Sequence, residues 1–258
     1  MYTMGIDVGS ASSKVVILED GNRIVAAEVI QVGTGSSGPK RALEKALEVS
    51  GLKMEDMTKI VATGYGRFAF KEADKQVSEI SCHAKGIFFL VPEARTIIDI
   101  GGQDAKAIRL DNKGGVKQFF MNDKCAAGTG RFLDVMSRVL EITLDDMAEY
   151  DSRATEIASI SSTCTVFAES EVISQLSQGV SKENIIAGVH QSVASKACGL
   201  AFRGGLEDAV VMTGGVAKNA GVVRAIEREL NRKVIVAPNP QTTGALGAAL
   251  FAYQEAIR

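Results

Sequence analysis

The chain lacks the features of several large classes of protein. Its 258 residues carry 29 basic and 31 acidic side chains, a formal net charge of −2, so there is no basic excess of the kind that binds nucleic acid. No apolar run is long enough to span a membrane. The first residues have the pattern of a buried strand and not of a charged segment followed by an apolar one. We therefore expect no signal peptide, no membrane partner and a cytoplasmic location.

Proline and cysteine are also scarce. There are four prolines against 26 glycines, and the glycines cluster at the ends of predicted strands, where loops that approach phosphate need them. The four cysteines are Cys82, Cys125, Cys164 and Cys198. In a cytoplasmic protein we expect them to be free or metal-bound and not disulfide-bonded. The glycine-lysine loop of P-loop enzymes is absent, so any phosphate site must use other glycine-rich turns.

The strongest pattern that is present is an internal duplication. Residues 3–8 predict a buried strand, followed by a second strand at 15–18, a hairpin turn at 20–22 and a third strand at 24–30. The same order returns from residue 96 onward. Laid over the first copy without a gap, Asp99 falls on Asp7, Gly101 on Gly9 and Lys106 on Lys14. Such self-similarity predicts an α/β protein built from two similar halves.

We expect the first half to cover residues 1–95 and to be completed by a C-terminal helix at 242–258. The second half then covers residues 96–241 and carries two conspicuous cysteines. Further strands are predicted at 60–63, 108–110, 116–121, 209–213 and 234–237. One helix is predicted to start at Pro39, and others to cover 77–90, 132–140, 144–148 and 166–176. A longer helix is predicted from a cap at Ser181 to about residue 202, the next one ends at about residue 230, and the last covers 244–256.

The glycine-rich turns at the strand ends suit a magnesium nucleotide. Glycine and serine N–H groups, together with Lys14, can cradle a polyphosphate. Asp7 and Asp99 can hold a hydrated magnesium ion, because that ion prefers oxygen ligands and keeps several waters. Gln103 or Asp104 could orient an attacking water. The candidate nucleotide-binding residues are Asp7, Ser10, Ala11, Ser12, Ser13, Lys14, Gly101, Gly102, Gln103, Gly214, Gly215, Lys218 and Gln241.

Two segments, 122–134 and 161–171, each place one cysteine after a short polar run and before a predicted helix. The first turn of a helix offers unpaired N–H groups and the positive end of the helix dipole, which favour a thiolate or a bound anion. Cys125 and Cys164 supply only half of a four-cysteine site. Either they bond to each other, or a second copy of the chain supplies the other half.

The three glycine-rich turns resemble the phosphate-1, phosphate-2 and adenosine motifs of the actin, Hsp70 and sugar-kinase superfamily of ATPases. That resemblance implies two ribonuclease-H-like domains with a nucleotide cleft between them. From Gly5 to Leu250 the chain is similar to a narrower family, the ATP-dependent activators (component A) of 2-hydroxyacyl-CoA dehydratases. Segments 122–134 and 161–171 are the most specific part of this resemblance.

The resemblance implies a homodimer that binds ATP or ADP with magnesium and holds one 4Fe–4S cluster between its subunits. Cys125 and Cys164 of each subunit are the implied ligands. Reduced ferredoxin or flavodoxin is the implied electron donor. ATP binding and hydrolysis would then drive one electron to the dehydratase, where it forms a ketyl radical anion from the 2-hydroxyacyl-CoA. The setting that the family implies is anaerobic amino-acid fermentation.

Two other functions remain open from the residues. A small-molecule kinase of the same fold would need a substrate pocket with a positioned base, and no inserted segment is present to build one. A non-catalytic, actin-like nucleotide switch would carry an ordinary disulfide in place of a metal cluster.

The remaining polar and sulfur side chains have plainer interpretations. Cys82 and Cys198 lie in helical stretches among apolar or small residues, which is typical of buried thiols. The two histidines, at 83 and 190, are expected to be structural or surface residues. For the charged residues near the two conspicuous cysteines we favour helix-solvating roles (Lys124, Arg131) and helix-dipole roles (Glu169, Glu171).

Overall fold

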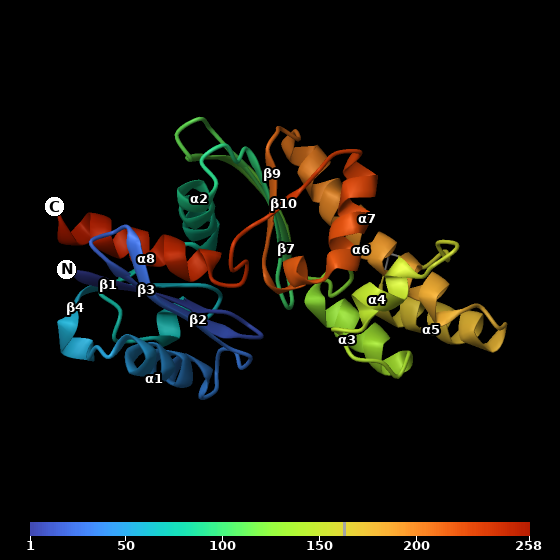
Figure 1. The fold of residues 1–258 in the computed structure, drawn as a ribbon, viewed down its shortest axis with the longest axis horizontal. Helices are drawn as coiled ribbons and strands as arrows, with labels where there is room; N and C mark the ends of the chain where they lie inside the picture. The colour runs from blue at the N-terminus through green and yellow to red at the C-terminus, as the bar shows by residue number, and fades with distance from the viewer. Residues whose placement is uncertain (162–163) are drawn as a thin grey trace. The chain divides into compact units, whose positions relative to one another are not determined.

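The computed structural model describes residues 1–161 and 164–258, and the chain divides into two compact units. Unit 1 consists of Met1–Arg95, Leu110–Lys117 and Ala237–Arg258. Unit 2 consists of Thr96–Arg109 and Gln118–Val236. Figure 1 labels the helices and strands of both. The mixed α/β class expected from the sequence is confirmed.

Unit 1 is built on a five-stranded sheet in the order β3-β2-β1-β4-β5. β1 pairs antiparallel with β2 and parallel with β4, and β2 pairs antiparallel with β3. The turn between β2 and β3 has positive φ at Asp20 and Gly21, as a tight hairpin requires. The strands are β1 (Tyr2–Val8), β2 (Ser13–Glu19), β3 (Arg23–Ile30), β4 (Met57–Thr63) and β5 (Lys75–Gln76). The helices are α1 (Gly38–Ser50), α2 (Glu79–Leu90), α8 (Thr243–Ala256) and the short 3-10 turns η1 (Met54–Asp56) and η2 (Arg67–Ala69).

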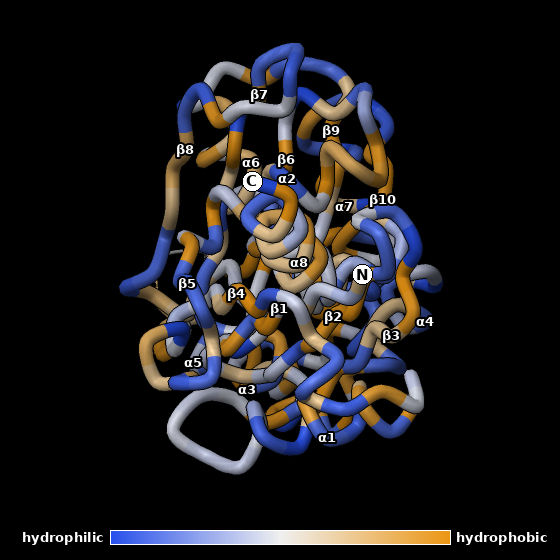
Figure 2. The backbone as a smooth tube through the Cα atoms, turned by 90° about the vertical axis from the view of Figure 1, so that its left-hand side faces the viewer, coloured by the Kyte–Doolittle hydropathy of each residue, from blue (hydrophilic) through white to orange (hydrophobic). Residues whose placement is uncertain are grey.

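Both faces of this sheet are covered, because alternate side chains of a strand point to opposite faces. On β2, Val15 and Ile17 belong to the core cluster that contains Ala42 and Ala46 of α1. The intervening Val16 and Leu18 belong to another cluster, with Ala245, Leu246, Ala249 and Leu250 of α8. Figure 2 shows α8 coloured largely as hydrophobic. The last helix of the chain therefore completes the core that the first strands begin.

Unit 2 repeats the same strand order, β8-β7-β6-β9-β10. β6 pairs antiparallel with β7 and parallel with β9. The strands are β6 (Thr96–Ile100), β7 (Ala105–Leu110), β8 (Val116–Asn122), β9 (Val210–Thr213) and β10 (Ile235–Val236). The helices are α3 (Gly130–Val139), α4 (Met147–Ser152), α5 (Thr165–Ser177), α6 (Lys182–Gly204), α7 (Ala220–Leu230) and the 3-10 turn η3 (Gly215–Lys218).

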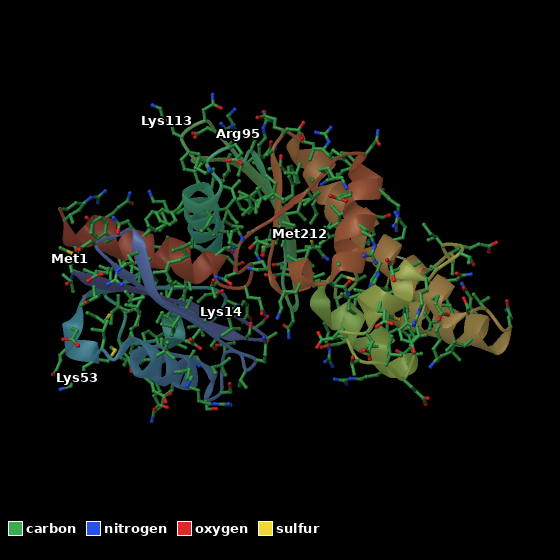
Figure 3. All side chains as sticks on the ribbon, viewed as in Figure 1. Met1, Lys14, Lys53, Arg95, Lys113 and Met212 are labelled. Carbon is green, nitrogen blue, oxygen red and sulfur yellow. The ribbon has the colours of Figure 1, made fainter. Side chains whose placement is uncertain are left out.

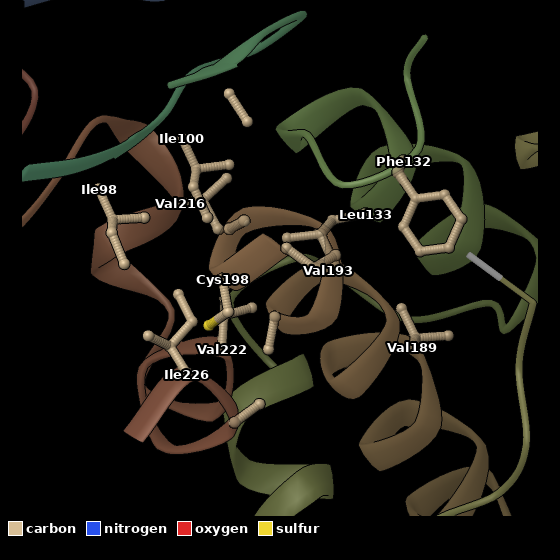
Figure 4. Packing of buried hydrophobic residues seen from close by; sticks show 14 of the residues in the cluster. Ile98, Ile100, Phe132, Leu133, Val189, Val193, Cys198, Val216, Val222 and Ile226 are labelled. Atoms are coloured by element: carbon tan, nitrogen blue, oxygen red, sulfur yellow. The ribbon is translucent and has the colours of Figure 1, made fainter. Parts of the chain in front are cut away.

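The core of unit 2 joins β6 and β9 to the long helix α6 and its neighbours. Ile98 and Ile100 of β6 belong to one buried cluster with Phe132 of α3, Val193 of α6 and Val222 of α7. Figure 4 shows this packing. Both α3 and α6 therefore share a core with β6.

Several predicted element bounds are wrong, and local hydrogen bonds explain two of them. The helix predicted from residue 77 begins at Glu79, because the Ser78 side chain accepts a hydrogen bond from Ser81 N and caps it. The helix predicted at 144–148 is α4, Met147–Ser152. Reciprocal hydrogen bonds between Thr143 and Asp146 hold a turn before it. The short strand β5 and the three 3-10 turns were not predicted.

None of the helices described by the structure is long and apolar enough to cross a membrane.

Candidate functional site

The first glycine-rich turn joins β1 to β2 in unit 1. Asp7 pairs with Lys14 across the two strands, and Lys14 Nζ lies 3.1 Å from Asp7 Oδ2 (Lys14 is labelled in Figure 3). Gly9 N donates to the Ser12 carbonyl and closes the turn. Ala11 is exposed at its tip, while the Ser13 hydroxyl donates to the Val32 carbonyl. The turn therefore presents backbone N–H groups around an ion pair at the end of a buried strand.

The neighbouring parallel strand β4 ends beside this turn. Thr63 is the register partner of Asp7, and Gly64 follows with φ +86°. A Cβ at Gly64 would overlap with Asp7 Oδ1 and would lie 2.7 Å from the Val8 carbonyl oxygen. Position 64 therefore requires glycine for two reasons: its φ is positive, and a side chain would overlap with the Asp7 carboxylate.

His83 approaches the same carboxylate from α2. Its Nδ1 lies 3.0 Å from Thr243 Oγ1, at the start of α8. A Cβ at Gly244 would lie 3.2 Å from His83 Nε2 and 3.4 Å from Asp7 Oδ2. His83 is buried, as a structural histidine would be, but its closeness to Asp7 was not predicted. Residues 83 and 7 are far apart in sequence, so no spacing pattern could have indicated it.

The second glycine-rich turn, between β6 and β7 in unit 2, has the same kind of ion pair, and its side chains are more deeply buried. Lys106 Nζ lies 3.0 Å from Asp99 Oδ2 and 2.8 Å from Asp104 Oδ2. The side chains of Lys106 and Asp99 are each only 3% exposed, against 15% for Lys14 and 8% for Asp7. Lys106 was missing from the predicted site, although the duplication aligns it with Lys14 and could have identified it.

The two residues predicted to orient water differ in their surroundings. Asp104 is partly buried, its carboxylate pairs with Lys106, and its carbonyl accepts from Gly101 N. The side chain of Gln103 lies exposed at the tip of the turn. Gln103 is therefore the one of the two whose side chain faces solvent.

The third glycine pair follows β9. Thr213 is the register partner of Asp99, and Gly214 has φ +86°, the same value as Gly64. A Cβ at Gly214 would overlap with the Ile100 carbonyl and would lie 2.7 Å from Asp99 Oδ1. Gly215 and Lys218 are exposed on the turn η3 that comes next. Gln241 lies in unit 1, just before α8, and is partly buried.

Cys125 and Cys164 are both partly buried and both lie in unit 2. Cys164 is the N-cap residue of α5, so the positive end of that helix faces the segment that carries its thiol. Cys125 precedes α3 by a short loop, which the Asn122 side chain fastens by donating to the Cys125 carbonyl (2.9 Å) and the Ala127 carbonyl (3.2 Å). Asn122 was not predicted to have this role.

Cys82 and Cys198 are different, as expected. Both are completely buried, and burial raises the pKa of each thiol to about 12. Cys198 packs among Val222 and Ile226 in the core (Figure 4). Such thiols are poorly suited to act as thiolate ligands. No disulfide joins the cysteines, all four of which belong to the described chain.

The Cys125 segment is directly hydrogen-bonded to the second glycine-rich turn. Gly130 N donates to the Gly101 carbonyl (2.9 Å), and Arg131 N donates to the Gly102 carbonyl (2.8 Å). These N–H groups belong to the first turn of α3, which has no partners within its own helix. The start of α3 is therefore fixed to the turn predicted to hold phosphate.

Two thiols and two carboxylates were predicted to bind metal. Across residues 1–161 and 164–258, no three or more His, Cys, Asp or Glu side chains gather in one group that could hold a metal ion. The donor set of Cys125 and Cys164 fits half of a 4Fe–4S cluster, since both residues are partly exposed and one is the N-cap residue of a helix. Asp7 and Asp99 each present carboxylate oxygens, the type of ligand that magnesium prefers, and each is paired with a lysine of the neighbouring strand.

The charged residues near the cysteines are partly as expected. Arg131 is exposed and pairs with Asp134 along α3 at 3.7 Å, in agreement with a helix-solvating role. The helix-dipole role expected for Glu169 and Glu171 is wrong, because no acidic residue lies in the first turn of α5. Glu171 Oε2 instead accepts a hydrogen bond from Ser161 N (2.6 Å). Ser162 and Thr163 of the predicted segment lie outside the described residues.

Curated relatives match the chain over nearly its whole length. It is 80% identical over 256 residues to the activator of lactoyl-CoA dehydratase from Anaerotignum propionicum, covering 99% of each chain. It is 56% identical to the (R)-2-hydroxyglutaryl-CoA dehydratase activating ATPase of Acidaminococcus fermentans, covering 100% of this chain and 99% of that one.

Solved structures support the same relationship. The activator of the 2-hydroxyisocaproyl-CoA dehydratase from Clostridium difficile, solved with bound ADPNP, has 57% identity and a TM-score of 0.97, covering 100% of this chain and 96% of that one. A ROK family glucokinase from Streptomyces griseus, at 14% identity and a TM-score of 0.60, shares the fold alone. The model of the BadF/BadG/BcrA/BcrD ATPase family matches residues 4–252, and this chain belongs to that family.

Proposed function

We propose that this chain is an ATP-dependent one-electron donor that activates a 2-hydroxyacyl-CoA dehydratase, acting in the cytoplasm under anaerobic conditions. Its membership of an ATPase family and its 80% identity to an activator of lactoyl-CoA dehydratase support this function. Lactoyl-CoA dehydratase is therefore the first partner to test, with reduced ferredoxin or flavodoxin as the electron donor.

We place the electron-carrying site at two of the four cysteines. Cys125 and Cys164 are the two partly accessible thiols, whereas Cys82 and Cys198 are buried in apolar cores with raised pKa values. Two copies of the chain together offer four thiolates, the number that completes a 4Fe–4S cluster. When bound, that cluster supplies one electron of low potential. The N-terminus of α5, which begins beside Cys164, favours the negative charge of such a site.

We place the nucleotide site at the glycine-rich turns. Backbone N–H groups of residues 10–13 and of Gly101–Gly102, together with Lys14, would bind the phosphates. Asp7 and Asp99 would hold magnesium through water. Gly214, Gly215, Lys218 and Gln241 would bind the adenosine. We assign the orientation of the attacking water to Gln103, because Asp104 is occupied by Lys106.

One observation carries the proposed coupling of these two sites. The first N–H groups of α3 donate to the carbonyls of Gly101 and Gly102, so the helix that follows Cys125 begins on the phosphate turn itself. If the turn changes its backbone when the terminal phosphate binds or leaves, those two hydrogen bonds carry the change into α3. ATP must then bind the two arrangements with different affinity, or it could not shift between them.

An iron and acid-labile sulfide assay with an absorption spectrum, on protein purified without oxygen, tests the proposal. About four irons per dimer, with a broad band in the blue region, is the expected result. Colourless, monomeric protein that still hydrolyses ATP after anaerobic reconstitution with iron and sulfide would contradict it. A small-molecule kinase of the same fold would then be the better interpretation.

A further inference from the structure

Unit 2 contains a buried polar cluster that the proposed mechanism does not use. His190 of α6 is 0% exposed, and its Nδ1 lies 3.0 Å from Oδ1 of Asp151, a buried residue of α4. The second carboxylate oxygen of Asp151 accepts from Arg224 Nε of α7 at 3.2 Å. Burial alone would raise the pKa of Asp151, but the hydrogen bonds from His190 and Arg224 outweigh it, and the pKa is lowered. Asp151 is therefore a carboxylate anchored by two donors.

Asn219 determines which nitrogen of His190 carries the proton. Its side-chain Oδ1 accepts from Gly221 N (2.9 Å) and from Val222 N (3.2 Å), which fixes the orientation of the amide. Its Nδ2 therefore points to His190 Nε2, 3.3 Å away. Nε2 must accept this hydrogen bond, so the proton is on Nδ1 and is donated to Asp151. The hydrogen bonds thus select one neutral tautomer of His190.

Asn219 also joins the adenosine turn to α7. It is the residue that ends η3, where its N–H donates to the Val216 carbonyl at 2.9 Å, and it is the N-cap of α7. A Cβ at Gly221 would overlap with the His190 ring, so the ring packs directly against the first turn of α7. The position of the imidazole and the start of α7 therefore fix each other.

We propose that His190 is a positioning residue of the nucleotide site, whose neutral ring holds Asn219 in the orientation that caps α7 and so fixes the turn Gly214–Lys218. This inference rests on the proposed assignment of that turn to adenosine. Without an acceptor at the position of Nε2, the Asn219 amide would lose the contact that holds it, and the cap of α7 would be weakened.

The charged surroundings of the ring are few. From α4 the facing group is Asp151, and from α7 it is Arg224, which acts through Asp151. The segment before α5 presents apolar and neutral groups to α6: the Ala158 carbonyl and Ile160 lie against Gly188, and the Ser161 carbonyl accepts from Ser192. The ring is therefore held between the Asp151 carboxylate at Nδ1 and the Asn219 amide at Nε2.

Two substitutions separate the two ends of the ring. An asparagine amide reaches the position of Nδ1, so His190→Asn keeps a donor for Asp151 but removes the acceptor for Asn219. A glutamine amide reaches the position of Nε2, so His190→Gln keeps that acceptor. MgATP and MgADP affinities would be measured by calorimetry, with KM and kcat for ATP hydrolysis and the unfolding midpoint of each variant.

We expect His190→Gln to bind nucleotide about fivefold more tightly than His190→Asn, the factor that the loss of one helix cap implies. The loss in His190→Asn should appear in Kd and KM more than in kcat. Wild-type affinity should be closer to that of His190→Gln than to that of His190→Asn, because only the glutamine keeps the acceptor for Asn219.

Equal affinities of the two variants, or losses that follow only their unfolding midpoints, would overturn the inference. Lys218→Ala separates this failure from a failure of the site assignment. If Lys218→Ala does not weaken nucleotide binding, the adenosine turn is wrongly assigned and the inference falls with it. If Lys218→Ala weakens binding but the two His190 variants behave alike, only the role of His190 is wrong.

Discussion

Units 1 and 2 have sheets with the same strand order but differ in one connection between strands. Each begins with a hairpin that ends on an aspartate paired with a lysine, Asp7 with Lys14 and Asp99 with Lys106. In each, the next parallel strand pairs its last residue, a threonine, with that aspartate and is followed by a glycine with φ +86°. The difference lies after the third strand. Unit 1 returns to its sheet through α1 and η1, whereas unit 2 inserts α3, α4, α5 and α6, and with them both partly accessible cysteines.

The comparison shows that the connection after the third strand can carry additional helices and cysteines while the glycine-rich turn is kept. In unit 2 the inserted helices also cover the turn: α3 is hydrogen-bonded to Gly101 and Gly102. The lysine of that turn is correspondingly deeper, and it bridges two carboxylates where Lys14 has one. Unit 1 therefore has a glycine-rich turn without these helices, and unit 2 has the same turn hydrogen-bonded to the helix that follows Cys125.

The largest difference between the units should appear among the cysteines. Cys125→Ala and Cys164→Ala should each abolish the bound iron and the activation of the dehydratase, while ATP binding remains. Cys82→Ala in unit 1 and Cys198→Ala in unit 2 are the matched controls, because both thiols are buried away from solvent. Iron content and dehydratase activity of all four variants check this. Activation that survives in Cys125→Ala and Cys164→Ala would contradict the proposed function.

The second largest difference should be in the free energy of unfolding, when the lysine of each turn is replaced. Lys106→Met leaves Asp99 buried without its cation and should lower the free energy of unfolding by about 3–5 kcal/mol. Lys14→Met removes the partner of a more exposed carboxylate and should cost about 1–2 kcal/mol. Denaturant unfolding of both variants, each against wild type, measures the difference. Equal costs would show that the depth of the second turn has no energetic consequence.

The two glycines should behave alike, which tests the equivalence of the units. Gly64→Ala and Gly214→Ala each force a side chain into positive φ and into contact with an aspartate carboxylate. We expect each to cost about 1–3 kcal/mol of stability and to weaken MgATP binding. Gly35→Ala is a useful control, since it also has positive φ but meets no atom within 4 Å. A nucleotide affinity that falls in only one of the two variants would show that the turns are not equivalent.

The smallest predicted effect concerns acid. Asp151 in unit 2 has a lowered pKa, because hydrogen bonds from His190 and Arg224 outweigh its burial. A lowered folded pKa gives stability that is complete above the ordinary aspartate value of about 3.9 and is lost as the pH falls through the lowered value. The unfolding free energy of wild type should therefore decline more steeply below about pH 4 than that of Asp151→Asn.

Asp74 of unit 1 offers the comparison for this effect. It also has a lowered pKa, since the hydrogen bonds from Ile60 N and Lys59 outweigh its burial, but its side chain is 42% exposed. Asp74→Asn should therefore change the acid dependence less than Asp151→Asn does. Urea unfolding at a series of acidic pH values measures both, and parallel curves for wild type and Asp151→Asn would show that the buried cluster contributes nothing to acid stability.

Much of the fold could be predicted because its signals are local. The hairpins at residues 20–22 and 112–115, the proline at the start of α1 and the serine cap of α6 all act within a few residues of where they stand. The placement of α4 and the short strand β5 could not be predicted. β5 pairs only two residues with β4, and its sequence carries no alternation long enough to indicate a strand.

The sequence by itself determined the duplication, the three glycine-rich turns and the two cysteine segments, because each is a spacing of residue types along a short stretch of chain. Only the tertiary structure decided how those residues are connected. It placed Lys106 between two carboxylates, attached α3 to the Gly101–Gly102 turn and brought His190 to Asp151 and Asn219. His190 lies 39 positions from Asp151 and 29 positions from Asn219 in the sequence. The strength of both contacts depends on their burial. Burial is a property of the packed core and has no counterpart in any local run of amino acids.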